Sequence, residues 1–84
     1  MDYFVYMLEC EGNRLYTGYT RDLERRFEQH LAGRGGMFTR FNRPVNMVYY
    51  ETHKTQRAAL RREREIKRLS RAEKEELIKS FEGS

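Results

Sequence analysis

Five side chains in this sequence are of types that act on phosphodiesters: Tyr6, Tyr16, Arg26, His30 and Glu63. A carboxylate oxygen is a suitable ligand for a hard divalent cation, and a guanidinium can bind two phosphate oxygens at once. A phenol or an imidazole can position an attacking water or take up its proton. Whether these groups can act together depends on the elements that carry them.

The two tyrosines lie in residues 3–20, which we interpret as a β-hairpin. Two apolar, tyrosine-rich runs flank a short polar turn, and Gly12 and Asn13 can take the positive φ that a tight hairpin needs. We favour a three-residue loop, 11–13, with a bulge at Asn13. Because two strands alone are not stable in water, the rest of the chain must cover this hairpin.

The loop length decides whether the two tyrosines can serve one site. With three loop residues, Tyr6 and Tyr16 share a face, and Tyr6 lies opposite Gly18, whose missing side chain would leave space above the Tyr6 ring. A two-residue turn at Gly12 and Asn13 would instead place the tyrosines on opposite faces.

Residues 20–33 predict a helix with Thr20 as its cap and Gly33 as its end. At about 100° per residue, one apolar stripe should be buried, formed by Leu23, Phe27 and Leu31. His30 falls within this stripe and Arg26 at its edge, whereas Arg21 and Arg25 point away. Arg26 could alternatively pair with Asp22, four residues earlier.

Glycines and arginines dominate the next segment, residues 33–44, which we expect to be a surface loop. Its aromatic rings could stack on exposed bases while its arginines hold phosphates, which makes these residues a candidate nucleic-acid-binding surface: Arg34, Phe38, Arg40, Phe41 and Arg43. Residues 45–52 then predict a third strand, with Pro44 at its first position.

Residues 55–69 predict a charged helix with a sparse apolar side: Ala59, Leu60, Ile66 and Leu69. Glu63 lies on that side, while Arg61, Arg64 and Arg68 project toward solvent, where they could also follow backbone phosphates. An ion pair with Arg26 is the structural alternative for Glu63. A last helix opens at Ser70, with Glu73 three residues later as in a capping box.

The length and composition of the chain indicate one domain, 1–84. Charged residues make up 36% and apolar residues 38%, and the net charge of +4 is compatible with a polyanionic partner. Cys10 is the single cysteine, so neither an internal disulfide nor a cysteine-based zinc site is possible. No run is long enough to span a membrane, and we expect a cytoplasmic protein.

Taken in order, these residues resemble the GIY-YIG nuclease superfamily, and more closely its small single-domain bacterial members of the UPF0213 kind. Phe4-Val5-Tyr6 stands where the family has its first tripeptide, and Tyr16-Thr17-Gly18 where it has its second. The helix matches R-x-x-x-H through Arg26 and His30, and Glu63 matches the acidic residue of the second long helix. Essentially the whole chain is covered, including the tail EIKRLSRAEKEELI.

The match has departures. Phe4 replaces the family's glycine and Thr17 its isoleucine, but neither change removes a side chain that the chemistry needs. The asparagine that follows the acidic residue in some members has no counterpart after Glu63.

The resemblance implies an α/β (α+β) fold, a three-stranded antiparallel sheet flanked by helices in the order ββαβαα. It also implies hydrolysis of nucleic-acid phosphodiesters with a divalent ion, Mg²⁺ or Mn²⁺, held by Glu63. Arg26 would clamp the scissile phosphate. Tyr6, with its pKa of about 10 lowered by a nearby cation, would accept the proton of water, and Tyr16 and His30 would position the water or phosphate.

A nuclease of this size has little surface for reading sequence, so we expect preference for a nucleic-acid shape or direction by a protein partner. DNA is expected ahead of RNA, with the chain acting as a monomer or weak dimer. The alternatives are a binding module of the same fold that no longer cleaves, and a protein-interaction domain that docks a partner on its last helices.

Overall fold

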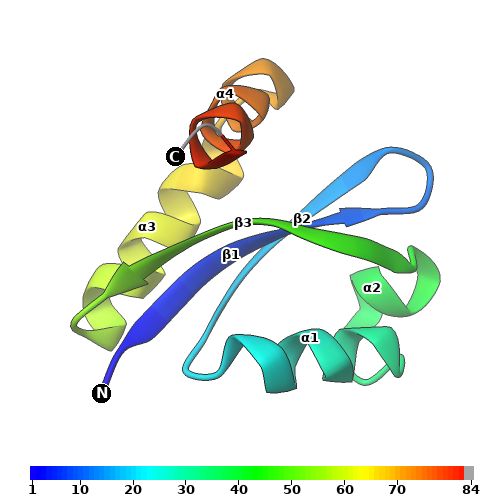
Figure 1. Ribbon diagram of the computed structural model, residues 1–84, viewed down its shortest axis with the longest axis horizontal. Helices are drawn as coiled ribbons and strands as arrows, with labels where there is room; N and C mark the ends of the chain where they lie inside the picture. The colour runs from blue at the N-terminus through cyan, green and yellow to red at the C-terminus, as the bar shows by residue number, and fades with distance from the viewer. Residues whose placement is uncertain (83–84) are drawn as a thin grey trace.

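A three-stranded antiparallel sheet with the order β2-β1-β3 organises the chain (Figure 1). Its strands are β1 (Tyr3–Cys10), β2 (Arg14–Thr20) and β3 (Pro44–His53). The computed structural model describes residues 1–82. The predicted fold class and the order ββαβαα are confirmed, with one short additional helix, α2 (Met37–Phe41), between the first long helix and β3.

The connection between β1 and β2 is the three-residue loop that the sequence favoured. Cys10 pairs with Arg14, so residues 11–13 form the loop. Gly12 and Asn13 take φ angles of 76° and 58°. The register pairs Tyr6 with Gly18, as predicted, and the side chains of Tyr6 and Tyr16 therefore lie on the same face of the sheet.

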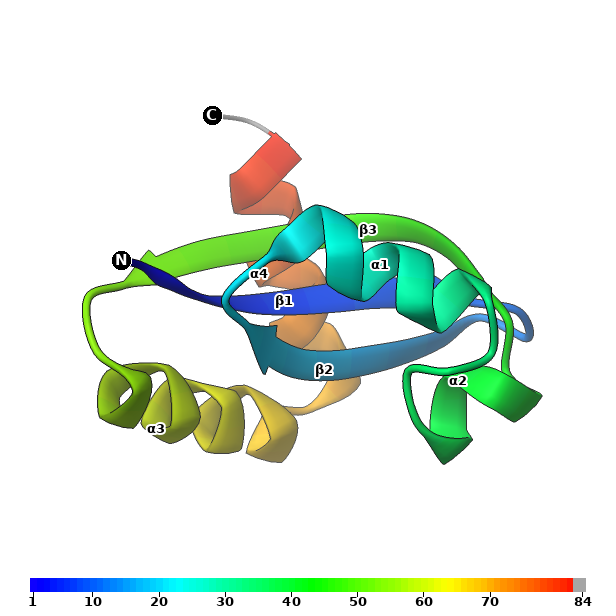
Figure 2. The same cartoon turned by 90° about the horizontal axis from the view of Figure 1, so that it is seen from below.

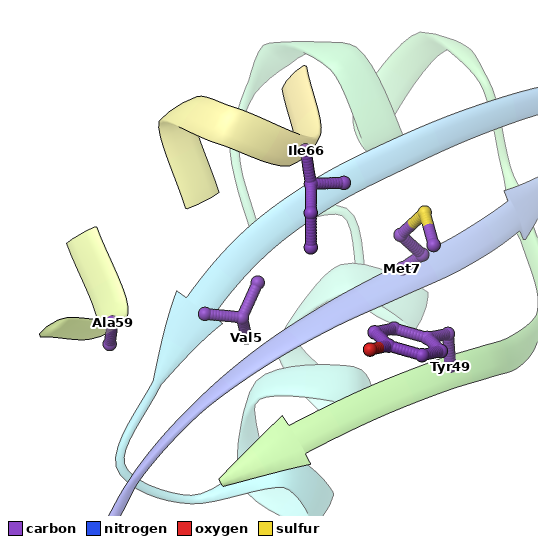
Figure 3. Close-up of a cluster of buried hydrophobic side chains, with 5 residues drawn as sticks. All are labelled: Val5, Met7, Tyr49, Ala59 and Ile66. Carbon is purple, nitrogen blue, oxygen red and sulfur yellow. The ribbon is translucent and has the colours of Figure 1, made fainter. Parts of the chain in front are cut away.

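Both faces of β1 are buried, because helices cover the sheet from both sides. One face packs against α3 (Gln56–Arg68) and α4 (Arg71–Glu82), with Val5, Met7 and Tyr49 meeting Ala59 and Ile66 (Figure 3). The other face packs against α1 (Leu23–Leu31). There the apolar cluster consists of Tyr6, Leu8 and Cys10 with Tyr16, Leu23, Phe27 and Met47.

Two details of α1 differ from the sequence prediction. Asp22, and not Thr20, is the cap, since its side chain accepts the backbone N–H of Arg25 at 3.1 Å. Leu31 is 44% exposed, and the inward position of the last turn belongs to His30, which is 1% exposed. The helix does end as predicted, because Gly33 has a φ of 77° and donates to the carbonyl of His30.

The segment that we expected to be a loop contains α2 (Met37–Phe41), a single short helix. Thr39 is 2% exposed and holds the helix against α1 through its hydroxyl, whereas Met37 and Phe41 are 76% and 75% exposed. A tertiary contact therefore stabilises helical structure in a sequence with weak local preference for it. The segment is still a surface feature, as expected.

The two C-terminal helices begin at the predicted residues. Thr55 accepts the backbone N–H of Ala58 at 3.1 Å, and Ser70 and Glu73 form the reciprocal bonds of a capping box at 2.9 and 3.2 Å. Within residues 1–82, no helix has the length and apolar character that crossing a membrane requires.

Candidate active site

A buried hydrogen-bonded chain joins three elements beneath the hairpin. The Tyr6 hydroxyl lies 2.7 Å from His30 Nε2, and His30 Nδ1 lies 2.6 Å from the Thr39 hydroxyl. These side chains come from β1, α1 and α2, and they are 0%, 1% and 2% exposed. The chain therefore fixes the Tyr6 ring and the imidazole in one mutual arrangement.

The protonation states of this pair follow from burial. Burial, reinforced by the charge of Arg26, lowers the pKa of His30 to about 4, so the imidazole is neutral near pH 7. Burial also raises the pKa of Tyr6 to about 12, which hydrogen bonding from Arg26 only partly offsets. Arg26 therefore does not lower the Tyr6 pKa below its usual value of about 10, because desolvation outweighs the charge and the hydrogen bond of this arginine.

Gly18 does not leave open space above the Tyr6 ring, as its position in the sequence suggested. A Cβ atom added there would lie 2.6 Å from the Tyr6 hydroxyl oxygen, 2.8 Å from Tyr6 Cζ and 3.1 Å from Tyr16 Cε2. The space above Gly18 is therefore occupied by the tyrosine rings themselves. The glycine lets the end of the Tyr6 ring cross β2 and reach His30.

Tyr16 is the more accessible of the two tyrosines. Its side chain is half-buried, and its ring centroid lies 5.0 Å from that of His30 and 6.3 Å from that of Tyr6. Its other side stacks on Phe38 at 5.6 Å with an interplanar angle of 29°. The Tyr16 hydroxyl makes no hydrogen bond to any other residue among 1–82, so it is the phenol that a water or phosphate oxygen can reach.

Arg26 is held beside this cluster by two hydrogen bonds. Its Nη1 donates to Gln29 Oε1 at 3.0 Å and its Nη2 to the carbonyl of Gly35 at 3.2 Å. The alternative pairing with Asp22 is not among the ion pairs of the described residues, and the Asp22 carboxylate accepts the backbone N–H of Arg25 instead. The guanidinium thus has a fixed orientation and an uncompensated charge that acts on both Tyr6 and His30.

Glu63 approaches from α3, on the other side of β2. Its side chain is only 14% exposed, and its carboxylate lies 3.5 Å from Lys67 Nζ, one turn later. The charge of Glu63 adds a small increase to the Tyr6 pKa, which burial raises first of all. An ion pair between Glu63 and Arg26 is not among those formed by residues 1–82.

The site is therefore assembled across the edge of the sheet. β2 is an edge strand, and α1 and α3 flank it on opposite sides (Figure 2). Four of the predicted residues form one contiguous cluster on the α1 side: Tyr6, Tyr16, Arg26 and His30. Glu63 reaches the same edge from the α3 side.

The predicted nucleic-acid-binding residues all lie on the surface of α2 and its flanking segments. Phe38 is 38% exposed and connects this surface to the site through its stacking on Tyr16. Phe41 is exposed beside Arg40, whose guanidinium lies 6.0 Å from the ring centroid. Arg40 and Arg43 also line a hollow of about 250 Å³ that reaches His30.

Sequence reasoning missed two residues of the site. Thr39 completes the buried chain, and a lone threonine between exposed residues gave no signal of its burial. Gly35 binds Arg26 through its carbonyl, and a Cβ atom there would lie 2.2 Å from His30 Nδ1. The three glycines in 33–36 indicated flexibility, although one of them leaves room for the imidazole.

Comparison with known proteins decides the family. The model of the GIY-YIG catalytic domain matches residues 2–76. The chain belongs to the GIY-YIG family. A UPF0213 protein of Natronomonas pharaonis is 48% identical to this GIY-YIG chain over 82 residues, which cover 98% of this chain and 96% of the relative.

Two further relatives support the same assignment. A UPF0213 protein of Staphylococcus aureus is 46% identical over 77 residues, covering 92% of this chain and 94% of the relative. The solution NMR structure of a UPF0213 protein from Bacillus halodurans superposes with a TM-score of 0.60 at 40% identity, covering 94% of this chain and 84% of that chain. The GIY-YIG assignment therefore holds for sequence and fold, and it places the chain in a nuclease-type family.

Proposed function

We propose that this GIY-YIG chain is a divalent-metal-dependent endonuclease that hydrolyses phosphodiester bonds of nucleic acid, with DNA as the preferred substrate. The observation that carries the proposal is the placement of an arginine and a carboxylate on the two helices, α1 and α3, that flank the edge strand β2 (Figure 2). Arg26 lies on one side with its guanidinium held by two hydrogen bonds and without an ion pair among the described residues, and the largely buried Glu63 lies on the other. A phosphodiester that lies along this edge would contact both.

Arg26 is the proposed phosphate clamp. Its two hydrogen bonds hold the guanidinium in place before substrate arrives, so little reorganisation is needed when charge develops on the phosphoryl oxygens. A lysine could not reproduce this arrangement, because its ammonium lacks the planar fork.

We assign the contact with the attacking water to Tyr16, in place of the Tyr6 that the family resemblance suggested. The Tyr16 side chain is only half-buried and its hydroxyl makes no hydrogen bond to another of residues 1–82, whereas the Tyr6 hydroxyl is buried against His30 with a pKa of about 12. Tyr6 and His30 are then positioning residues. Both rings contact the Tyr16 ring and hold it in place.

Glu63 is the proposed metal ligand. Among the described residues, no three acidic, histidine or cysteine side chains gather as a metal site, so the chain would supply a single carboxylate. That donor set fits Mg²⁺ or Mn²⁺, which are commonly bound by one or two carboxylates, with waters and substrate phosphate completing the shell. The ion would supply positive charge at the phosphoryl and leaving oxygens.

The exposed surface of α2 is the proposed path of the nucleic acid away from the site. Phe38 and Phe41 could stack on bases, while Arg34, Arg40 and Arg43 bind phosphates. The stacking of Phe38 on Tyr16 makes this path continuous with the site. Stacking and phosphate contacts depend on the shape of a strand and not on its sequence. This surface therefore supports a nuclease that is structure-selective or directed by a partner.

The test uses labelled single-stranded, duplex and branched DNA and RNA with Mg²⁺ or Mn²⁺. The informative variant is Glu63→Gln, and Glu65→Gln is its matched control, since Glu65 is on the same helix and its side chain is 58% exposed. We expect cutting by the wild type to fall by about 100-fold or more in Glu63→Gln and to change little in Glu65→Gln.

Other outcomes would contradict the proposal in different ways. Cutting that survives Glu63→Gln would exclude Glu63 as the metal ligand. Salt-sensitive binding without cutting would identify a non-catalytic binding module. No binding to any nucleic acid at low salt would exclude both and leave a protein-interaction domain.

A further inference from the structure

A second hollow adjoins the site on the side away from α2. It has a volume of about 490 Å³ and lies where the start of β1 and the end of β2 meet α1 and the first turn of α3. Arg26 belongs both to its lining and to the proposed active site. The residues that give the hollow its character are Tyr3, Tyr19, Arg21, Arg25, Arg26 and Gln56.

The aromatic residues of this hollow are held in place by polar neighbours. Gln56 Nε2 donates to the Tyr19 hydroxyl at 3.2 Å, which ties the ring to the first turn of α3. The Arg21 guanidinium lies over the Tyr3 ring at 5.2 Å from its centroid. Both tyrosines also pack at the margin of the apolar cluster under α3, so neither ring is free to turn away.

The charge of the lining is strongly positive. Three arginines face one carboxylate, that of Asp22, and this carboxylate is already engaged as the cap of α1. Arginines that bind phosphate, a tyrosine ring that stacks on a base, and an amide that can both donate and accept at a base edge are together the groups that recognise a nucleotide. The volume falls within the range of about 300–1,000 Å³ that is typical of ligand pockets.

The geometry points to a nucleotide subsite: the nucleotide next to the scissile phosphate places its base in this hollow, against Tyr19, with Gln56 at the base edge. This inference rests on the proposed function, because Arg26 links the hollow to the phosphate that is cut. A base can enter only after it leaves its stack, which is costly in a duplex and much less so in a single strand or a frayed end. The subsite therefore selects substrates that are unpaired beside the cleavage point.

The test measures binding without metal, in EDTA, so that it does not depend on cleavage. Two probes are titrated: a short oligothymidylate, and an oligomer with the same phosphate backbone and no bases. The variants are Tyr19→Leu and, at an exposed position that does not threaten the fold, Gln56→Ala. Arg64→Ala is the control, since Arg64 is an exposed arginine of α3 that lines a different hollow.

If the subsite exists, Tyr19→Leu weakens binding of oligothymidylate by about 10-fold and Gln56→Ala by about threefold, while both leave binding of the baseless oligomer unchanged. Arg64→Ala affects both probes equally. Equal effects of Tyr19→Leu and Gln56→Ala on the two probes, no effect on either, or failure of the wild type to bind oligothymidylate would each overturn the inference. If Tyr19→Leu and Gln56→Ala weaken only the binding of oligothymidylate, but the wild type cuts no nucleic acid with Mg²⁺ or Mn²⁺, the nuclease proposal alone would be refuted.

Discussion

Replacing Gly18 by alanine should disable the site through a single methyl group. The new Cβ atom would lie 2.6 Å from the Tyr6 hydroxyl oxygen and 2.8 Å from Tyr6 Cζ, where carbon contacts need about 3.5 Å or more. Tyr6 would have to move by roughly 0.7 Å, yet it is 0% exposed and bonded to His30 at 2.7 Å. The hydroxyl therefore cannot move without stretching that bond.

Three contributions determine how much Gly18→Ala changes the free energy of unfolding. Alanine is favoured over glycine in a strand by about 0.5–1 kcal/mol, because it loses less backbone entropy on folding. Overpacking costs about 1–3 kcal/mol, and a buried hydroxyl or imidazole left without its partner costs a further 1–3 kcal/mol or so. We expect a net loss of about 2–4 kcal/mol in the free energy of unfolding, measured by urea denaturation, and loss of most nuclease activity.

Gly33→Ala is the control for this experiment. No atom lies within 4 Å of the position that a Cβ would take at Gly33, but its φ of 77° is unfavourable for alanine, by about 1–2 kcal/mol. This variant should lose stability without losing activity. If Gly18→Ala were as stable and active as the wild type, the tight contact between Gly18 and Tyr6 would not exist and the proposed positioning role of Tyr6 would be wrong.

Three further predictions concern charged groups. Burial and Arg26 lower the pKa of His30 from 6.5 to about 4, so between these pH values the unfolded chain binds more protons than the folded chain. The free energy of unfolding, measured by urea denaturation, should therefore fall by up to about 3 kcal/mol as the pH decreases from 6.5 to about 4. The same profile should be flatter in His30→Asn. Lys67→Gln removes the cation 3.5 Å from Glu63 and should lower the Mg²⁺ concentration for half-maximal cutting by about two- to threefold, a modest effect because Lys67 is 53% exposed. Arg62→Met removes the 2.8 Å ion pair of the partly buried Glu51 and should lower the free energy of unfolding by about 1–2 kcal/mol, seen as a lower melting temperature.

Each of these predictions has a result that would contradict it. Identical pH profiles for the wild type and His30→Asn would show that His30 does not titrate abnormally. An unchanged Mg²⁺ requirement in Lys67→Gln would argue against Glu63 as the ligand. For Arg62→Met the matched control is Arg61→Met, at an exposed position of the same helix, and equal losses in the two variants would show that the bond to Glu51 is not the cause.

The hairpin and the long helices could be predicted because their signals are local. Gly12 and Asn13 fixed the loop length through the backbone angles that they tolerate, and the loop length in turn fixed which tyrosines share a face. The 3.6-residue period placed His30 inward and Glu63 on the covered side of α3 in the same way. Periodicity, register and caps depend on residues that are close together in the chain, so a single sequence is enough to predict them.

The remaining features depend on contacts between distant segments. Thr20 and Asp22 are both acceptable caps, and only the observed path of the chain into α1 selects Asp22. Thr39 and Gly35 acquire their roles from the imidazole of His30, which no local pattern connects to them. The weak effect of Arg26 on the pKa of Tyr6 has the same cause: the sequence indicated a neighbouring arginine, but the depth at which Tyr6 is buried is a tertiary property.

The position of β2 at the edge of the sheet explains how helices on opposite faces can serve one phosphate. If the helices lay over a central strand, the sheet would separate Arg26 on α1 from Glu63 on α3, because further strands would extend on both sides of that strand. At the edge, the two helices flank a single strand (Figure 2). Gly18 in that strand leaves room for the Tyr6 ring to pass. The same edge leaves backbone groups of β2 unpaired, so a bound strand of nucleic acid would cover a surface that is otherwise open to pairing with another chain.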